Sequence, residues 1–263
     1  MEILISFIIP FVILLTVVVF IHEYGHYYYA KKYGVGVTDF SIGFGKEIFG
    51  FNDKSGTRWK FCLIPLGGYV KFFGDRNVFS QAEQAELLKK YSEEDQKKLF
   101  VVKPLYQRSL IVAAGPFANF LLAILIFAFI YMFAGKDFTP AQIQEVQPDS
   151  PAYEVGIKSG DIIKSINDKE VKSIMEVSAF INSSSSNIID IGILRNDNEL
   201  NFSVEPKVIK SEDALGNKAN KKIIGIKIAP LNEEINRQRL GPATALFYAI
   251  KETWFVIDAS WNF

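Results

Sequence analysis

Ile21-His22-Glu23-Tyr24-Gly25-His26 lies at the inner end of a long apolar run, and the rest of the chain is organised around it. His22 and His26 are the only histidines in the sequence. Residues four apart lie on one face of a helix, so the two imidazoles can bind one metal ion. Imidazole is a common zinc ligand, and a glutamate beside the first histidine can deprotonate a metal-bound water. The pattern predicts a zinc site with Glu23 as general base.

A pattern this short also arises by chance, and Gly25 is a poor helix former. Its surroundings favour the metal site. Apart from tyrosines, His22, Glu23 and His26 are the only ionisable side chains between Ile3 and Ala30. Ionisable groups in an apolar helix are costly without a functional partner.

The run Ile3–Ile21 predicts a membrane-spanning helix, because it covers roughly 28 Å at 1.5 Å per residue. Lys31 and Lys32 follow this helix and only Glu2 precedes it, which places the lysine end in the cytoplasm. The N-terminus has neither a basic region nor a small-residue cleavage site, so we expect the helix to be retained. The site would then lie near the cytoplasmic side, below the membrane surface.

Composition excludes other classes of function. The formal net charge is zero, so nothing indicates a nucleic-acid partner. The single cysteine, Cys62, excludes an intrachain disulfide and a cysteine-based zinc site. Its more ordinary role is that of a small apolar residue in a strand.

A His-Glu-x-x-His motif at the end of a first membrane helix resembles the site-2 protease family of intramembrane zinc metalloproteases, most closely the bacterial regulator of sigma E protease branch. The resemblance implies a Zn2+ endopeptidase of the bacterial inner membrane. Its substrates would be single-span membrane proteins such as anti-sigma factors, cleaved within their transmembrane segments during regulated intramembrane proteolysis. The implied partners are these substrates and the lipid bilayer.

The region Gly34–Gly74 has the composition of β-structure, with paired glycines at a turn or a close backbone approach. An ordinary hairpin in a cytosolic loop is one interpretation. The stretch Pro65-Leu66-Gly67-Gly68-Tyr69-Val70-Lys71 is similar to a family signature that forms a membrane-reentrant β-loop. That similarity implies substrate binding by Gly67, Gly68 and Tyr69, and an edge strand can bind an extended segment by strand addition. Ser41-Ile42-Gly43-Phe44-Gly45 also resembles a family motif.

Ser109–Gly135 is a second uncharged run and predicts a second span. It contains Gly115-Pro116-Phe117-Ala118-Asn119, and a buried amide such as that of Asn119 must find a partner. The resemblance implies that Asn119 faces the active site and binds substrate; a hydrogen bond between helices is the alternative. The charged segment Ser80–Lys103 before it is expected to be a surface helix or a linker.

The segment after Lys136 is expected to be soluble and to lie outside the cytoplasm. The spacing from Ser150 to Val171 resembles a PDZ domain, with Gly160-Asp161 in a tight turn, Ile163 and Ile166 in the core, and Asn167-Asp168 closing a hairpin. Ile174–Ile181 would be the groove helix. Ile188–Leu194 and Leu200–Val204 would form a terminal hairpin around Asn196-Asp197-Asn198. No Gly-rich carboxylate-binding loop is evident around Phe138–Ile143. The sequence therefore allows two roles for this domain, binding of a peptide or a steric gate above the active site.

The last part is expected to contain a polar linker, Lys207–Lys222, a closing strand, Ile223–Ala229, and the start of a third membrane-associated segment, Leu240–Trp261. A catalytic zinc usually has three protein ligands. In the family the third is the aspartate of a Leu-Asp-Gly motif, which is absent here, and the surroundings of Asp258 do not match it. We therefore expect the chain to be truncated at its C-terminus. A catalytically incomplete, membrane-anchored PDZ adaptor is the alternative.

The predicted fold class is a membrane protein with an α-helical transmembrane core, a reentrant β-loop and an inserted α+β PDZ-like domain. The predicted segments follow in order: first transmembrane helix 1–33, β-loop and linker 34–107, second transmembrane helix 108–135, PDZ-like domain 138–208, linker and closing strand 209–239, third segment 240–263.

Overall fold

The computed structural model describes residues 4–75, 90–184, 186–212, 218–230 and 235–261. The chain divides into two compact units, Met1–Ile124 and Leu125–Phe263, and each is described by itself. Two helices among the described residues, Ile5–Lys32 and Leu105–Phe133, are long and apolar enough to cross a membrane.

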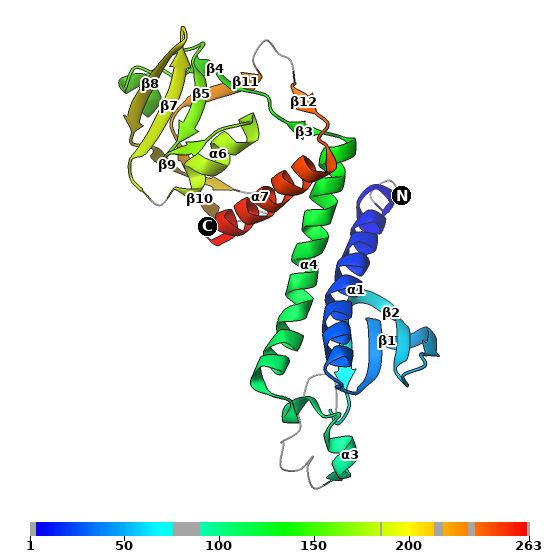
Figure 1. Ribbon diagram of the computed structural model, residues 1–263. Coiled ribbons are helices and arrows are strands. Elements are labelled where there is room, and N and C mark those ends of the chain that lie inside the picture. Colours follow the sequence, from blue (N-terminus) through cyan, green and yellow to red (C-terminus); the bar gives the residue numbers. More distant parts are fainter. Residues whose placement is uncertain (1–3, 76–89, 185, 213–217, 231–234, 262–263) are drawn as a thin grey trace. The chain divides into compact units, whose positions relative to one another are not determined.

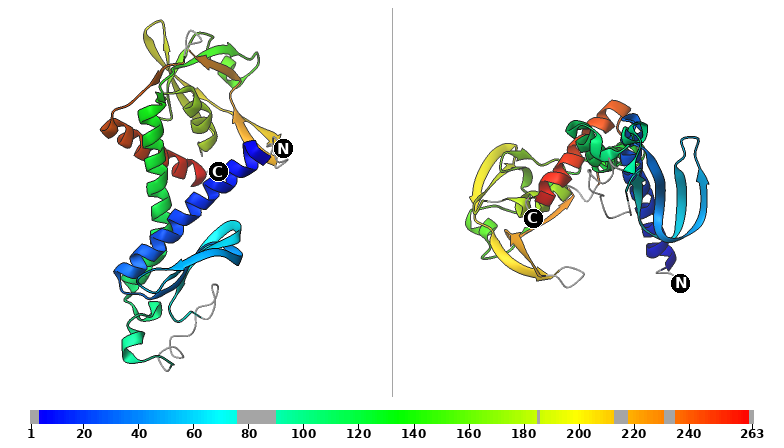
Figure 2. Two further views of the ribbon diagram at one scale, coloured as in Figure 1. Left: turned by 90° about the vertical axis from the view of Figure 1, so that its right-hand side faces the viewer. Right: turned by 90° about the horizontal axis from the view of Figure 1, so that it is seen from below.

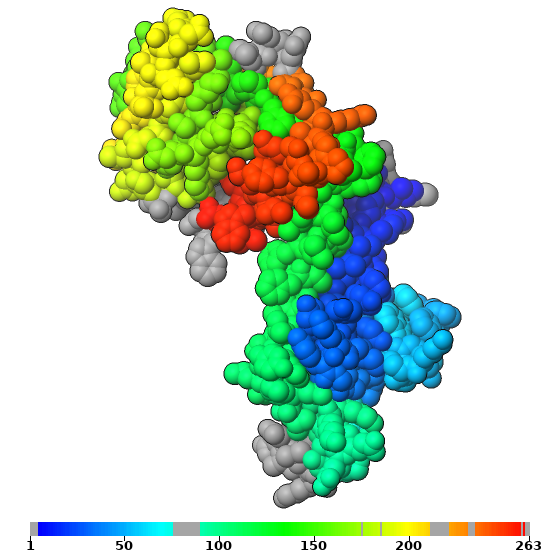
Figure 3. Space-filling model, viewed as in Figure 1, coloured from blue at the N-terminus to red at the C-terminus, as the bar shows by residue number. Residues whose placement is uncertain are grey.

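In the first unit, a π-helical turn, Leu4–Ile8, leads into α1 (Ile9–Lys32), which carries the His-Glu-x-x-His motif. The helix α4 (Leu105–Phe133) begins before the predicted Ser109 and includes Arg108 in its first turn. Only the part of α4 up to Ile124 belongs to this unit. The atoms of α1 and of this part of α4 touch in the space-filling view (Figure 3).

Gly25 allows this contact. A Cβ built on Gly25 would lie 2.8 Å from the carbonyl carbon of Ala114 and 3.0 Å from Ala118 Cβ, both on α4. A side chain here would therefore force the helices apart, since packed interiors tolerate little added volume. A residue that lowers helix propensity within the motif thus permits close helix packing.

The strands β1 (Val37–Asn52) and β2 (Arg58–Phe72) form an antiparallel sheet that lies beside α1 (Figures 1 and 2). Each long strand contributes two segments, because residues 39–42 pair both with 58–61 and with 68–71. The segment 58–61 also pairs with 49–52, so 68–71 is an edge of this sheet. Gly43 and Gly45 have φ angles of +85° and +86° where β1 changes partners, which only glycine adopts without strain.

Asp53, in the connection between β1 and β2, ties the sheet to α1. One carboxylate oxygen accepts hydrogen bonds from the Ser55 and Thr57 amides, at 2.8 and 2.9 Å, and from the Ser55 hydroxyl at 2.7 Å. The other accepts from the Tyr27 hydroxyl of α1 at 2.7 Å and from the Trp59 indole at 3.2 Å. Burial by itself would raise the pKa of Asp53, but these hydrogen bonds outweigh it and hold the pKa well below its usual range.

We expect acid to loosen this connection. Because the pKa of Asp53 is lower in the folded state, its stabilisation is complete above the unfolded value of about 3.9 and is lost as pH falls below it. Hydrogen-exchange protection of the Ser55 and Thr57 amides should therefore fall below pH 4 in the wild type. Asp53→Asn should already show reduced protection at pH 6, because it keeps one acceptor oxygen but not the charge. Equal protection of wild type and variant at pH 6 would contradict this role.

The charged segment between β2 and α4 is described only from residue 90 onward, so the predicted surface helix falls partly outside the described residues. Within the described part, a single helical turn, α3 (Glu93–Gln96), follows Ser92, whose hydroxyl caps it by accepting from the Asp95 amide. A 3-10 turn, Phe100–Val102, comes next. Leu99 is fully buried among Phe73, Tyr91, Val101 and Val102, so this end of the segment is packed and not an open linker.

The second unit contains an antiparallel sheet in the order β11-β4-β5-β7-β8, with β6 paired to β5. These strands are β4 (Ala141–Val146), β5 (Ile162–Ile166), β6 (Lys169–Glu170), β7 (Ile189–Arg195), β8 (Asn198–Val204) and β11 (Ile226–Pro230). Two short strands, β3 (Lys136–Asp137) and β12 (Arg237–Gln238), pair separately. The helices are α5 (Pro151–Glu154), α6 (Ile174–Ser183) and α7 (Pro242–Trp261).

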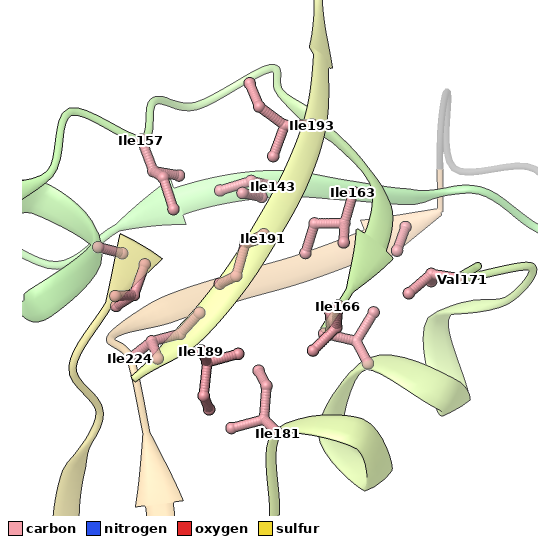
Figure 4. Packing of buried hydrophobic residues seen from close by; sticks show 14 residues of the cluster. Ile143, Ile157, Ile163, Ile166, Val171, Ile181, Ile189, Ile191, Ile193 and Ile224 are labelled. Atoms are coloured by element: carbon pink, nitrogen blue, oxygen red, sulfur yellow. The ribbon is translucent and has the colours of Figure 1, made fainter. Parts of the chain in front are cut away.

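Isoleucines dominate the core of this unit (Figure 4). Ile163 and Ile166 of β5 are 1% and 0% exposed, which confirms both predicted core positions. The turns are also confirmed: Gly160 has φ +93°, and the pairs Asn167-Asp168 and Asn196-Asp197 all have positive φ, as two-residue hairpin turns require. The predicted groove helix and terminal hairpin correspond to α6 and to β7 with β8.

The predicted polar linker Lys207–Lys222 is wrong for its described residues. Lys207–Glu212 forms β9 and Lys218–Ile223 forms β10, and the two pair antiparallel. Their lysines and other polar side chains hide the strand pattern, because a solvated two-stranded hairpin needs no alternating apolar face. The closing strand is confirmed as β11, which pairs with β4 at the edge of the sheet.

Candidate metal centre

His22 and His26 lie one turn apart on α1 with their Nε2 atoms 3.1 Å apart. Two nitrogens bound to one tetrahedral zinc, each at about 2.05 Å, lie about 3.3 Å apart. The two imidazoles therefore converge as two ligands of one zinc ion would. Their rings are nearly perpendicular, with an interplanar angle of 79°, so they meet through these nitrogens and not through their faces.

The Nδ1 atoms of both imidazoles contact residues of α4. His26 Nδ1 lies 2.7 Å from the carbonyl oxygen of Ile111, and His22 Nδ1 lies 3.2 Å from Asn119 Nδ2. A carbonyl oxygen can only accept, so His26 Nδ1 carries the hydrogen and its Nε2 keeps a lone pair for a metal. Such an outer hydrogen bond is the usual way in which a protein orients a metal-binding histidine.

Because Gly115 of α4 has no side chain, the space beside the two Nε2 atoms stays open. A Cβ built on Gly115 would collide with His26 Nε2 and would lie 2.7 Å from His22 Nε2. Ile111, Gly115 and Asn119 follow one another at intervals of four residues, so they form one face of α4. Along this face, Ile111 contacts His26, Gly115 lies against both histidines, and Asn119 contacts His22. The chemistry of the donors and the open space fit a zinc ion.

Glu23 lies toward the sheet. A Cβ built on Gly68 would be 3.2 Å from Glu23 Cγ and 2.8 Å from Val19 Cγ1, so the edge segment 68–71 passes close to the glutamate stem. The Val70 backbone amide also interacts with the Glu23 carboxylate. Of the three residues expected to bind substrate in this loop, Gly68 is thus the one placed directly against the site.

Gly67 and Tyr69, on either side of Gly68 in the sequence, both contact Phe44 of β1 or lie close to it. Gly67 has φ +115°, and a side chain there would also clash with Phe44. The Tyr69 ring stacks on Phe44, with centroids 6.1 Å apart. These contacts explain how the Gly-Gly-Tyr stretch fits against the Gly-Phe-Gly stretch of β1. Substrate binding by the three residues stays a prediction.

Among the described residues, no three His, Cys, Asp or Glu side chains gather closely enough to hold a metal ion together. The site as described therefore provides two ligands, His22 and His26, with Glu23 as the nearby carboxylate. The sequence motif predicted these three residues. The Ile111 carbonyl and Gly115 were not predicted as parts of the site, although the spacing of four residues before Asn119 was a signal that could have found them.

A His-Glu-x-x-His motif on a helix, with the two imidazoles converging and the glutamate between them, is the pattern of a zinc metalloprotease. Comparison with known proteins agrees: the profile of Peptidase family M50 matches residues 10–261. The chain belongs to this family, the site-2 proteases. A candidate zinc metalloprotease from Mesorhizobium japonicum is 39% identical over 258 residues, covering 97% of this chain and 70% of the relative. Metalloprotease MmpA from Caulobacter vibrioides is 33% identical, covering 82% of this chain and 56% of the relative.

The solved PDZ domain of an SdrC-like protein from Listeria monocytogenes is similar to part of the chain. The likeness covers 35% of this chain and 88% of that domain, with 24% sequence identity and a TM-score of 0.28. A score this low supports no conclusion about the fold. The PDZ-like interpretation of the second unit rests on the strands and turns described above.

Proposed function

We propose that the protein is an intramembrane zinc endopeptidase that cleaves transmembrane segments of single-span membrane proteins. The observation that carries this proposal is the convergence of His22 Nε2 and His26 Nε2, 3.1 Å apart, next to Glu23 in an apolar helix. A helix that only anchored the protein would need none of these groups, because ionisable side chains in a membrane helix are costly.

His22 and His26 would hold the zinc ion, which when bound polarises the scissile carbonyl and makes water a better nucleophile. Glu23 would accept a proton from the attacking water and pass it to the leaving amine nitrogen. The third ligand would be an aspartate, as the family resemblance implies.

The sheet would present the substrate. A peptide bond can be cleaved only where the substrate helix is unwound, and an unwound segment needs backbone partners within the apolar phase. The edge segment 68–71 lies beside Glu23, and strand addition there would align an extended substrate with the site. We propose that this segment lies at membrane depth as the reentrant β-loop, and that anti-sigma factors are among the substrates.

The PDZ-like module would act on the opposite side of the bacterial inner membrane from the lysine end of α1. A groove of ≈ 180 Å³ runs between α6 and β11, lined in part by Val177, Ile181, Gly225 and Ile226. The strand β4 lies inside the sheet, so β11, at the edge, is the strand that could add a peptide. The groove supports peptide binding over a gate for this module.

The function is tested by removing and restoring the metal. The purified full-length protein, in detergent with a single-span reporter substrate, should lose cleavage on treatment with a zinc chelator and regain it on addition of Zn2+. A reporter whose transmembrane segment is replaced by a soluble linker should be left uncut. Cleavage that persists at the lowest free zinc concentration would contradict the assignment as a metalloprotease. Zinc-independent binding of the reporter without cleavage would favour the membrane-anchored PDZ adaptor.

A further inference from the structure

A row of hydrogen bonds crosses the metal centre and joins two residues of the same face of α4, Asn119 and Ile111. Asn119 Nδ2 lies 3.2 Å from His22 Nδ1, His22 Nε2 lies 3.1 Å from His26 Nε2, and His26 Nδ1 lies 2.7 Å from the Ile111 carbonyl oxygen. Asn119 Oδ1 is buried and has no hydrogen-bond partner among the described residues. The asparagine thus uses only one end of its amide.

In the absence of a metal ion, the direction of this row follows from the carbonyl end. The Ile111 oxygen accepts, so neutral His26 donates from Nδ1 and accepts at Nε2. His22 must then donate from Nε2, and its Nδ1 must accept from the Asn119 amide N–H. Every hydrogen bond points the same way, from Asn119 to Ile111.

A zinc ion requires a different arrangement. Both Nε2 atoms must then present lone pairs, so the His22 hydrogen moves to Nδ1. That nitrogen would now face the Asn119 N–H group, and two donors 3.2 Å apart repel. Turning the amide by 180° exchanges its oxygen and nitrogen with almost no change in outline, and it places Oδ1 against the Nδ1–H of His22.

We propose that Asn119 is a positioning residue whose amide turns over when zinc binds, donating to His22 without the metal and accepting from it with the metal. This inference rests on the proposed zinc site. It explains the residue type, because an amide offers a donor and an acceptor of the same shape, whereas aspartate offers only acceptors and leucine neither. The turned amide also leaves its N–H group without a protein partner among the described residues, and the predicted substrate-binding role needs such a donor.

The acceptor role separates two substitutions at position 119. In the detergent-solubilised full-length protein, zinc affinity is measured by competition with a chromogenic chelator. Asn119→Leu should weaken zinc binding by about 10–100-fold, the usual effect of losing an outer hydrogen bond to a metal-binding histidine. Asn119→Asp keeps an acceptor for His22 Nδ1–H, so its zinc affinity should stay within about threefold of the wild type. Ser109→Ala, which removes an exposed hydroxyl from the same helix, is the matched control and should change nothing.

Three outcomes would contradict the inference or its foundation. Unchanged zinc affinity in Asn119→Leu would show that His22 needs no partner at Nδ1. Equal losses in Asn119→Leu and Asn119→Asp would show that the amide only packs the two helices. If the wild type binds zinc no more tightly than His22→Ala, the proposed zinc site itself fails, whatever the variants at position 119 do.

Discussion

Replacing Glu23 with glutamine is expected to lower substrate cleavage by the full-length protein by about 10²–10⁴-fold, the usual contribution of a general acid–base group. Glutamine has the same size and keeps an oxygen acceptor near the Val70 amide, so the sheet should stay in place beside α1. It cannot accept a proton from water at neutral pH. Zinc binding should be preserved, because the converging nitrogens belong to His22 and His26.

The comparison needs two measurements on each protein: the cleavage rate of a single-span reporter at saturating zinc, and the zinc affinity. Glu154→Gln, an exposed change of the same kind on α5, serves as the control and should leave both unaltered. Cleavage by Glu23→Gln at the wild-type rate would show that Glu23 is not the general base. Loss of zinc by this variant would instead make Glu23 part of the metal-binding set.

Gly115→Ala is expected to weaken zinc binding by at least about 100-fold, which exceeds the effect of losing a single outer hydrogen bond. The added methyl group would occupy the space between the two Nε2 atoms, colliding with His26 Nε2 and lying 2.7 Å from His22 Nε2. Either the imidazoles must turn away or the helices must separate. Both changes destroy the convergence that binds the metal.

Gly241→Ala is the matched control for this prediction, because a Cβ at Gly241 would meet nothing within 4 Å. Zinc affinity is again read from chelator competition. Circular dichroism of both proteins shows whether the helices are retained. Wild-type zinc affinity in a folded Gly115→Ala protein would mean that the metal does not occupy the space between Gly115 and the two Nε2 atoms.

Local sequence patterns predicted the parts of this protein whose structure depends on near neighbours. His22, Glu23 and His26 lie within one helix, so their spacing alone placed them together. The turns at Asn167-Asp168 and Asn196-Asp197 depend on two residues each, and the predicted turns are confirmed. The same holds for Ile163 and Ile166, which the PDZ-like spacing after Gly160-Asp161 assigned to the core and which are buried.

Other features depend on contacts that no local pattern records. Asn119 meets His22 across 97 positions of sequence, and only the family resemblance implied that it faces the site. The role of Gly25 in helix packing is invisible until Ala114 lies against it. The hairpin of β9 and β10 was missed because its sequence is rich in lysine, and its pairing depends on backbone hydrogen bonds. Membrane depth of the β1–β2 sheet stays a prediction.

The four-residue interval between Ile111, Gly115 and Asn119 makes the centre sensitive to the length of α4. Each residue inserted into an α-helix rotates everything beyond it by about 100° and shifts it by about 1.5 Å. One residue added between Ile111 and Asn119 would therefore turn the amide away from His22 while the Ile111 carbonyl stayed with His26. Zinc binding should consequently tolerate a change in helix length better outside the segment 111–119 than within it.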